Sequence, residues 1–328
     1  MVASFTGKKP EKCAYRQQEC FFNGLDVFRA KAYAFVWPRP EALRFGHPLE
    51  IHRMSDNTTT PLIDPGPSWK IRGPLRQSVA AWCFQPMKLE TLARQAKAMG
   101  YESVELVEPP EWPILKKHGL INGMILSHGF VTGLNDVKHH ERCLAILRER
   151  IDLASAAGFP NVITFSGMKK KIPDDLAKSN CVKALKKIVG HAEKRCVNLC
   201  IEVLNSRVDV EMKGHPGYQC DTIEWAAEVI DRVGSERVKI LFDLYHTQIM
   251  QGDLTTRLRR YKDYIGHVHV AGVPGRSELD LPDQEINYPA VMRTLRQIGY
   301  KGLVGQEFIP TRRDKIAALR RAAYLCDV

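Results

Sequence analysis

The sequence lacks several features that would assign it to a specialised class of protein. None of its hydrophobic runs approaches the roughly 18 uninterrupted apolar residues of a membrane-spanning helix. Nine cysteines in 328 residues are too few for a disulfide scaffold, and no two are spaced as C-x-x-C. The start of the chain carries no apolar secretion signal. These absences favour a globular cytoplasmic protein with reduced cysteines.

A nucleotide fingerprint and a concentrated basic patch are also missing. Neither G-x-G-x-x-G nor G-x-x-x-x-G-K follows any expected strand. The formal net charge is +11, from 48 basic and 37 acidic residues, but the basic residues are scattered along the chain. Scattered basic residues are typical of solvated helix faces, so we expect no nucleic-acid partner. Their summed field would attract an anionic small-molecule substrate.

Residues 1–77 show no helix-length periodicity and are rich in proline. Eight of the 19 prolines lie in this first quarter of the chain. We therefore expect an irregular N-terminal extension, followed by a catalytic domain over residues 78–328. Within the extension, we expect residues 1–53 either to be disordered or to precede a true translation start at Met54.

From residue 78 onward, apolar runs alternate with amphipathic helical patterns. The runs expected to be strands are 78–84, 103–107, 124–128, 161–166, 198–204, 238–245, 266–271 and 302–308. The helical patterns that follow them are 88–99, 113–118, 138–157, 174–194, 221–233, 254–264, 288–298 and 313–325. Eight such units in about 250 residues predict an α/β fold, a (β/α)8 TIM barrel with buried parallel strands. A doubly wound open sheet is the alternative, although it usually has fewer units.

Functional residues of a TIM barrel lie at the C-terminal ends of its strands. Each of the last four expected strands carries an ionisable residue within an apolar run, namely Glu202, Asp243, His269 and Glu307. Converging carboxylates repel one another unless a cation lies between them. Three carboxylates and one imidazole suit a single divalent metal ion, Mn²⁺ or Mg²⁺, with Co²⁺ or Zn²⁺ as further candidates.

Three other histidines are candidates for the same end of the barrel. His267 shares a face with His269 because side chains alternate along a strand, but it lies deeper and is expected in the core. His246 follows Asp243 at the exit of its strand, which suits contact with a substrate. His128 ends the third expected strand and is a weaker candidate for substrate binding.

The order and spacing of these residues resemble the xylose isomerase-like barrel superfamily. Within it, the sequence is most similar to hydroxypyruvate isomerases and ketose 3-epimerases. The likeness covers about residues 78–328, and its most specific segments are 201–205, 242–248, 265–270, 285–288 and 302–308. The first four strands match less well, and Trp82, Glu105 and His128 are not diagnostic.

The resemblance implies specific roles for these residues. The implied metal ligands are Glu202, Asp243, His269 and Glu307. Glu202 and Glu307 would also form the acid/base pair, and His246 and Arg276 would contact substrate oxygens. The implied reaction is a proton shift alpha to a carbonyl through an enediolate, by a metal-dependent isomerase of carbohydrate metabolism acting on a keto-acid or sugar.

Other functions stay open at this point. Ketose 3-epimerisation could use the same residues, with the size of the pocket selecting the substrate. An abasic-site endonuclease agrees with the net charge of +11. The resemblance implies a site for three metal ions in such enzymes, whereas this sequence supplies ligands for one. A catalytically silent binding protein is the third class. We expect no membrane association, and a homo-oligomer is left open.

Overall fold

The computed structural model describes residues 65–328, and the expectations for residues 1–53 lie outside this range. The segment that precedes the first strand contacts the end of the chain. The rings of Trp69 and Tyr324 meet edge-on with centroids 5.5 Å apart. The backbone N–H groups of Arg72 and Gly73 donate hydrogen bonds to the carboxylate of Asp327. Part of the expected extension therefore packs against the last helix of the barrel.

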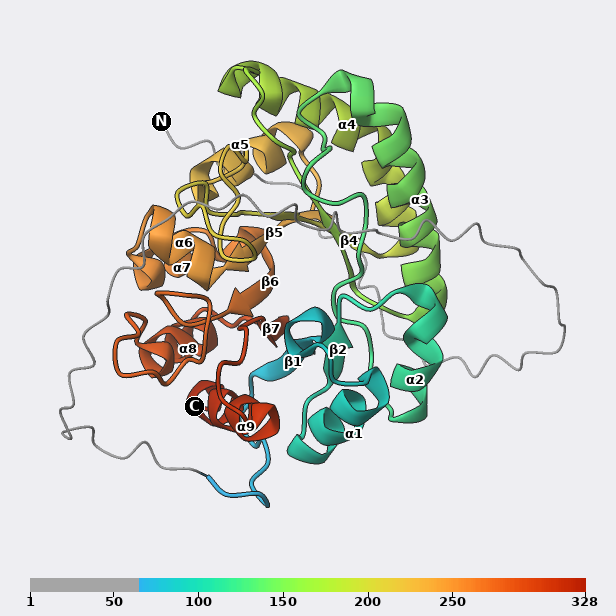
Figure 1. Ribbon diagram of the computed structural model, residues 1–328. Helices are drawn as coiled ribbons and strands as arrows, with labels where there is room; N and C mark the ends of the chain where they lie inside the picture. Colours follow the sequence, from blue (N-terminus) through green and yellow to red (C-terminus); the bar gives the residue numbers. More distant parts are fainter. Residues whose placement is uncertain (1–64) are drawn as a thin grey trace, which may run out of the picture. The chain divides into compact units, whose positions relative to one another are not determined.

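Seven parallel strands of the described residues form one curled sheet, with helices around its outside (Figure 1). The order of neighbours is β2-β1-β7-β6-β5-β4-β3. The strands are β1 Arg76–Ala80, β2 Ser103–Glu105, β3 Asn161–Thr164, β4 Asn198–Glu202, β5 Val238–Asp243, β6 Ile265–Val270 and β7 Leu303–Gln306. This topology confirms the predicted TIM barrel.

Residues 121–125 connect the two edge strands of this sheet. We expected a regular third strand at 124–128, and that expectation was wrong. Isolated parallel bridges join the segment to Ser103 of β2 and to Val162 of β3. Backbone hydrogen bonds join the segment to both neighbours, from Leu106 N–H to the carbonyl of Met124 and from Ile125 N–H to the carbonyl of Asn161. The segment therefore occupies the place of the eighth strand.

The helices follow the predicted pattern closely. They are α1 Leu89–Met99, α2 Trp112–Lys117, α3 His140–Ala157, α4 Asp174–Arg195, α5 Ile223–Val233, α6 Leu244–Met250, α7 Leu254–Arg260, α8 Tyr288–Gln297 and α9 Lys315–Cys326. Short 3₁₀ turns occur at Ala81–Phe84, Pro109–Glu111, Val137–His139 and Lys262–Tyr264. Helices α1 and α3 end at Gly100 and Gly158, whose φ angles of +92° and +72° favour glycine.

One helix, α6, was not among the helices expected from the sequence. We expected strand residues over 238–245, but β5 ends at Asp243 and α6 follows at once. The Asp243 side chain accepts a hydrogen bond from the backbone N–H of His246, which caps the new helix. His246 therefore lies in the first turn of α6 and not on a strand.

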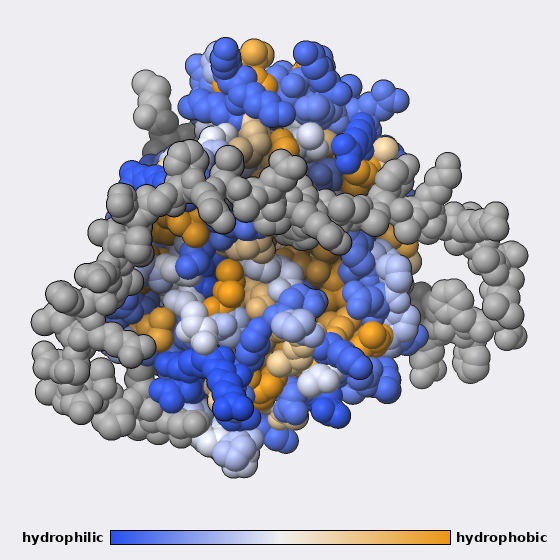
Figure 2. Space-filling view, viewed as in Figure 1, coloured by the Kyte–Doolittle hydropathy of each residue, from blue (hydrophilic) through white to orange (hydrophobic). Residues whose placement is uncertain are grey.

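Apolar side chains fill the interior, and polar ones cover the outer helices. Figure 2 shows one face of the molecule, with hydrophilic side chains gathered toward its rim and hydrophobic ones scattered among them. The strands are almost entirely buried. Among the described residues, no helix combines the length and the apolar character needed to cross a membrane. Because helices cover the outside of the sheet, charged groups on the strands can cluster only inside the barrel or at its ends.

Candidate metal centre and substrate site

Four neighbouring strands bring the predicted ligands together. Glu202 and Asp243 are the last residues of β4 and β5, His269 is the penultimate residue of β6, and Glu307 follows β7. The parallel register pairs Asp243 with His269, and His269 with Gly305. Because β4, β5, β6 and β7 are consecutive in the sheet, the four side chains converge at the C-terminal end of the barrel.

The four side chains are buried and close together. One candidate ligand atom from each lies within 4.8 Å of the others. The Nδ1 atom of His269 is 3.0 Å from Oε2 of Glu307 and 3.7 Å from Oε1 of Glu202. None of the four residues is more than 5% exposed. Three buried carboxylates at this spacing need compensating positive charge.

The environment shifts the pKa values of the three carboxyls in different directions. Burial raises the pKa of Asp243 to about 7 and also raises the pKa of Glu202. Burial opposes ionisation of Glu307 as well, but His269 and Arg276 outweigh it and hold the pKa of Glu307 well below its usual range. Glu307 is therefore the most readily ionised member of the cluster.

Arg276 provides a second positive charge at the site. Its Nη2 donates to Oε2 of Glu307 at 2.6 Å, and its Nη1 donates to the backbone carbonyl of Met212 at 2.9 Å. The guanidinium lies over the rings of Trp82 and Tyr245, 5.0 and 5.7 Å from their centroids. The predicted substrate contact is thus adjacent to the cluster and held on several sides.

His246 is buried next to the cluster at the start of α6. Its Nδ1 accepts a hydrogen bond from the backbone N–H of Asn205 at 3.0 Å, so the remaining proton of the neutral ring belongs on Nε2. That Nε2 lies 3.8 Å from Oδ2 of Asp243 and makes no hydrogen bond. Burial holds the pKa of His246 well below its usual range, so the ring is neutral.

His128 lies apart from the four clustered side chains. Its Nε2 is 3.0 Å from the hydroxyl of Thr164, and its Nδ1 is within 3.2 Å of the carbonyls of Gly129 and Thr132. Burial lowers the pKa of His128 to about 4. A neutral ring satisfies all of these neighbours, and its role as a substrate contact stays a prediction.

Our expectations assigned no role to Glu105, which the structure puts directly beneath the cluster. Glu105 is the last residue of β2 and is fully buried. Its carboxylate lies 3.0 Å from Nε2 of His267 and 3.3 Å from Nε2 of His269. Burial alone would raise the pKa of Glu105, but the two imidazoles lower it to about 2. An ionisable residue inside the apolar run 103–107 was the signal for it.

Trp82 is the other contact that the sequence pattern left unassigned. Its indole N–H donates to Oε1 of Glu307 at 3.0 Å. It lies in the 3₁₀ turn that follows β1, so the first strand also contributes to the site. Glu307 therefore receives hydrogen bonds from Trp82 and from Arg276, one on each carboxylate oxygen.

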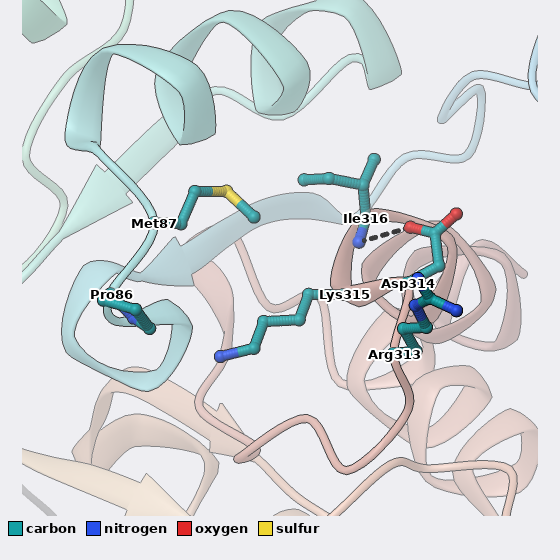
Figure 3. A pocket seen from close by; sticks show the side chains of 6 residues that line it. All are labelled: Pro86, Met87, Arg313, Asp314, Lys315 and Ile316. Atoms are coloured by element: carbon teal, nitrogen blue, oxygen red, sulfur yellow. Dashed lines mark hydrogen bonds between the residues drawn. The ribbon is translucent and has the colours of Figure 1, made fainter.

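A separate hollow of about 660 Å³ lies between the loops that follow β1 and β7. Its lining residues are Pro86, Met87, Arg313, Asp314, Lys315 and Ile316 (Figure 3). Asp314 turns back to cap α9, and Lys315 donates to the carbonyl of Gln85. Its lining includes none of the clustered ligands.

A family model described as "xylose isomerase-like TIM barrel" matches residues 93–324. The chain belongs to the xylose isomerase-like TIM barrel family. A human relative, whose name provisionally assigns it as a hydroxypyruvate isomerase, is 30% identical over 235 residues, covering 70% of this chain and 78% of the relative. A 2-oxo-tetronate isomerase of Cupriavidus necator is 29% identical over 231 residues, covering 66% and 85% of the two chains. These names agree with the expected class of enzyme, an isomerase or epimerase.

Several solved structures share the fold of this chain. A protein of Brucella melitensis titled "AP endonuclease, family 2" aligns with a TM-score of 0.64 and 24% identity over 74% of this chain and 96% of that one. A 3-keto-D-glucoside 4-epimerase of E. coli aligns with a TM-score of 0.63 and 19% identity over 77% and 99%. The IOLI protein, whose title says that it binds a zinc atom, aligns with a TM-score of 0.61 and 17% identity. The alignment covers 77% of this chain and 95% of that one. At these identities the likeness concerns the fold.

Proposed function

We propose that this protein is a metal-dependent isomerase of a keto-acid or sugar, similar in activity to hydroxypyruvate isomerase. The observation that carries the proposal is the convergence of Glu202, Asp243, His269 and Glu307 at the C-terminal end of the barrel. The relatives named as isomerases of hydroxypyruvate and 2-oxo-tetronate support the same class of reaction. A place in carbohydrate metabolism follows from these substrates, and the cytoplasmic location stays a prediction.

The donor set suits a hard divalent cation. Three carboxylates and one imidazole offer three oxygens and one nitrogen, which favours Mn²⁺ or Mg²⁺ and also admits Co²⁺ or Zn²⁺. The Nδ1 atom of His269 faces the carboxylates of Glu202 and Glu307, so it is the nitrogen proposed as the ligand. When bound, such a cation supplies Lewis-acid polarisation of the substrate carbonyl.

Glu202 and Glu307 are the proposed acid/base pair. They approach His269 from the ends of strands β4 and β7, which lie on either side of β5 and β6 in the sheet. One carboxylate removes a proton alpha to the carbonyl, which yields an enediolate. The other, or the same one, returns the proton to the adjacent carbon, and the hydroxyl proton passes to the former carbonyl oxygen, so that carbonyl and hydroxyl exchange places.

Arg276 and His246 are the proposed substrate contacts. The guanidinium of Arg276 would pair with the carboxylate of a keto-acid, since it presents a buried positive charge beside Glu307. The neutral His246 would donate from Nε2 to a substrate hydroxyl, because that nitrogen has no hydrogen-bond partner among residues 65–328. His128 is proposed as a more distant contact.

Ketose 3-epimerisation is the second candidate. Structural neighbours titled D-psicose 3-epimerase and L-ribulose 3-epimerase favour it, and the same pair of glutamates could return the proton to the opposite face of one carbon. The two reactions differ in the carbon that accepts the proton. The substrate's size and charge, and not the ligand set, would then decide between them.

The test is to incubate the full-length protein in D₂O with Mn²⁺ and either hydroxypyruvate or free ketoses, and to follow deuterium incorporation by NMR. Deuterium at the carbon alpha to the carbonyl of hydroxypyruvate, with formation of tartronate semialdehyde, is the expected result. Exchange in a ketose at C3 alone would favour the epimerase. No exchange with any substrate would contradict the proposal and leave a nuclease or a binding protein.

A further inference from the structure

A buried carboxylate next to the four clustered side chains has no role in the proposed reaction. Glu105 ends β2, on the far side of β1 and β7 from the ligand strand β6. It contacts two histidines of β6, with its Oε2 3.0 Å from Nε2 of His267 and its Oε1 3.3 Å from Nε2 of His269. All three side chains are fully buried. A buried carboxylate with no cationic partner would cost several kcal/mol, so this contact calls for a reason.

The backbone is shaped to admit this carboxylate. Gly305 of β7 faces both Glu105 and His269. A Cβ atom at position 305 would lie 2.0 Å from Oε1 of Glu105 and 2.8 Å from Cδ2 of His269. Every other residue type would therefore displace one of these side chains. The missing side chain at Gly305 leaves the carboxylate in reach of the imidazole.

The two nitrogens of the His269 ring face carboxylates on opposite sides, Nε2 toward Glu105 and Nδ1 toward Glu202 and Glu307. A nitrogen that binds a metal ion carries no proton. When a cation lies among the four clustered side chains at Nδ1, the proton of the neutral ring is therefore on Nε2, 3.3 Å from Oε1 of Glu105.

We propose that Glu105 is a positioning residue that holds His269 with its proton on Nε2 and so presents Nδ1 to the divalent cation. The inference rests on the proposed metal-dependent function. Carboxylates that hold a ligating histidine in this way change metal affinity about 10- to 100-fold when they are replaced. Glu105 is not one of the four clustered side chains, so in this proposal it acts on the cation through His269.

The experiment is a titration of the metal-free full-length protein with Mn²⁺, with free Mn²⁺ followed by electron paramagnetic resonance. Wild type is measured first. We expect Glu105→Gln to bind Mn²⁺ about 10- to 100-fold more weakly. The matched control is Glu102→Gln, the same change at the exposed residue that precedes β2 and pairs with Arg76. This variant should bind Mn²⁺ as tightly as wild type does. Circular dichroism checks that each variant is folded.

Two further measurements keep the inference testable if Glu105→Gln does not fold. Gly305→Ala keeps every ionisable group but presses on both the Glu105 carboxylate and the His269 ring, so it should also weaken Mn²⁺ binding. Independently, ¹⁵N-histidine NMR of the wild-type protein loaded with Mg²⁺ should place the proton of His269 on Nε2. A proton on Nδ1, or wild-type affinity in a folded Glu105→Gln variant, would overturn the inference alone. Absence of Mn²⁺ binding by wild type would overturn the proposed function together with it.

Discussion

The two halves of the barrel contribute differently to the site. Strands β4 to β7 supply all four clustered ligands, each at or next to the end of a strand. The first half, from β1 to β3, supplies none of these ligands. It contributes instead the contacts that surround them, an indole N–H from Trp82 to Glu307 and the Glu105 carboxylate beneath His269.

This difference separates two requirements of a buried ionic site. The second half concentrates charge where the proposed cation binds, which is costly unless that charge is neutralised. The first half fixes the orientation and protonation of groups that belong to the second half. Variants in the second half should therefore change chemistry and metal affinity directly, whereas those in the first half should act on stability or through a neighbour.

The largest expected effect comes from the glutamates of the second half. Glu202→Gln and Glu307→Gln keep an oxygen ligand but remove a base, so turnover should fall by about 10² to 10⁴ at saturating Mn²⁺. We also expect asymmetry, with one variant retaining exchange of the alpha proton in one substrate stereoisomer. Deuterium wash-in at excess metal is the measurement. Turnover close to wild type in both variants would assign the acid/base role elsewhere, with His246 as the next candidate.

In the first half, His128 should affect stability in acid. Its pKa in the folded protein is about 4, below the value of about 6.5 in an unfolded chain. Between these values the unfolded chain binds a proton that the folded protein does not, so stability is complete above pH 6.5 and falls as the pH decreases. At pH 5 the loss amounts to about 2 kcal/mol from this one group.

His128→Gln should remove that loss. Urea unfolding at pH 7 and pH 5 would measure it, and the decrease in the free energy of unfolding between the two pH values should be about 2 kcal/mol smaller in the variant. The more exposed His139→Gln is the control for loss of a histidine. An unchanged pH dependence would mean that His128 is already protonated in the folded protein at pH 5.

Asp243→Asn tests the metal role of the second half more gently. The amide removes one charge from the cluster but keeps an oxygen that can cap α6, so the fold should persist. Mn²⁺ affinity should weaken by at least about tenfold, and turnover should recover as Mn²⁺ is raised. A deficit in turnover that persists at saturating metal would show that Asp243 also takes part in the chemistry.

The smallest effect is expected from the first half. Trp82→Phe keeps the aromatic face under Arg276 but removes one of the hydrogen bonds to Glu307. A hydrogen bond to a charged carboxylate contributes at least about 1.5 kcal/mol, so kcat/KM should fall about tenfold. Mn²⁺ affinity should stay within about twofold of wild type. A loss as large as that of Glu307→Gln would show that Trp82 does more than orient the glutamate.

The sequence predicts the functional residues of the second half better than those of the first. In the second half, ionisable residues interrupt apolar runs at the ends of successive strands, and parallel pairing carries them to one end of the barrel. Glu105 interrupts its run in the same way, yet its partners lie more than 160 positions along the chain. Helix α6 was missed, because its first residues continue the apolar run of β5 and its cap from Asp243 to His246 does not show in that pattern.

The sequence alone determined the alternation of strands and helices, the glycine ends of α1 and α3, and the strand positions of the four candidate ligands. These follow from local periodicity, because burial on one or both faces dictates which residue types recur. Only the tertiary structure decided that residues 121–125 stand in for a strand, that Trp82 and Arg276 share Glu307, and that Gly305 admits Glu105 beside His269. Those features depend on side chains from strands far apart in the sequence meeting within a few ångströms, which no local pattern records.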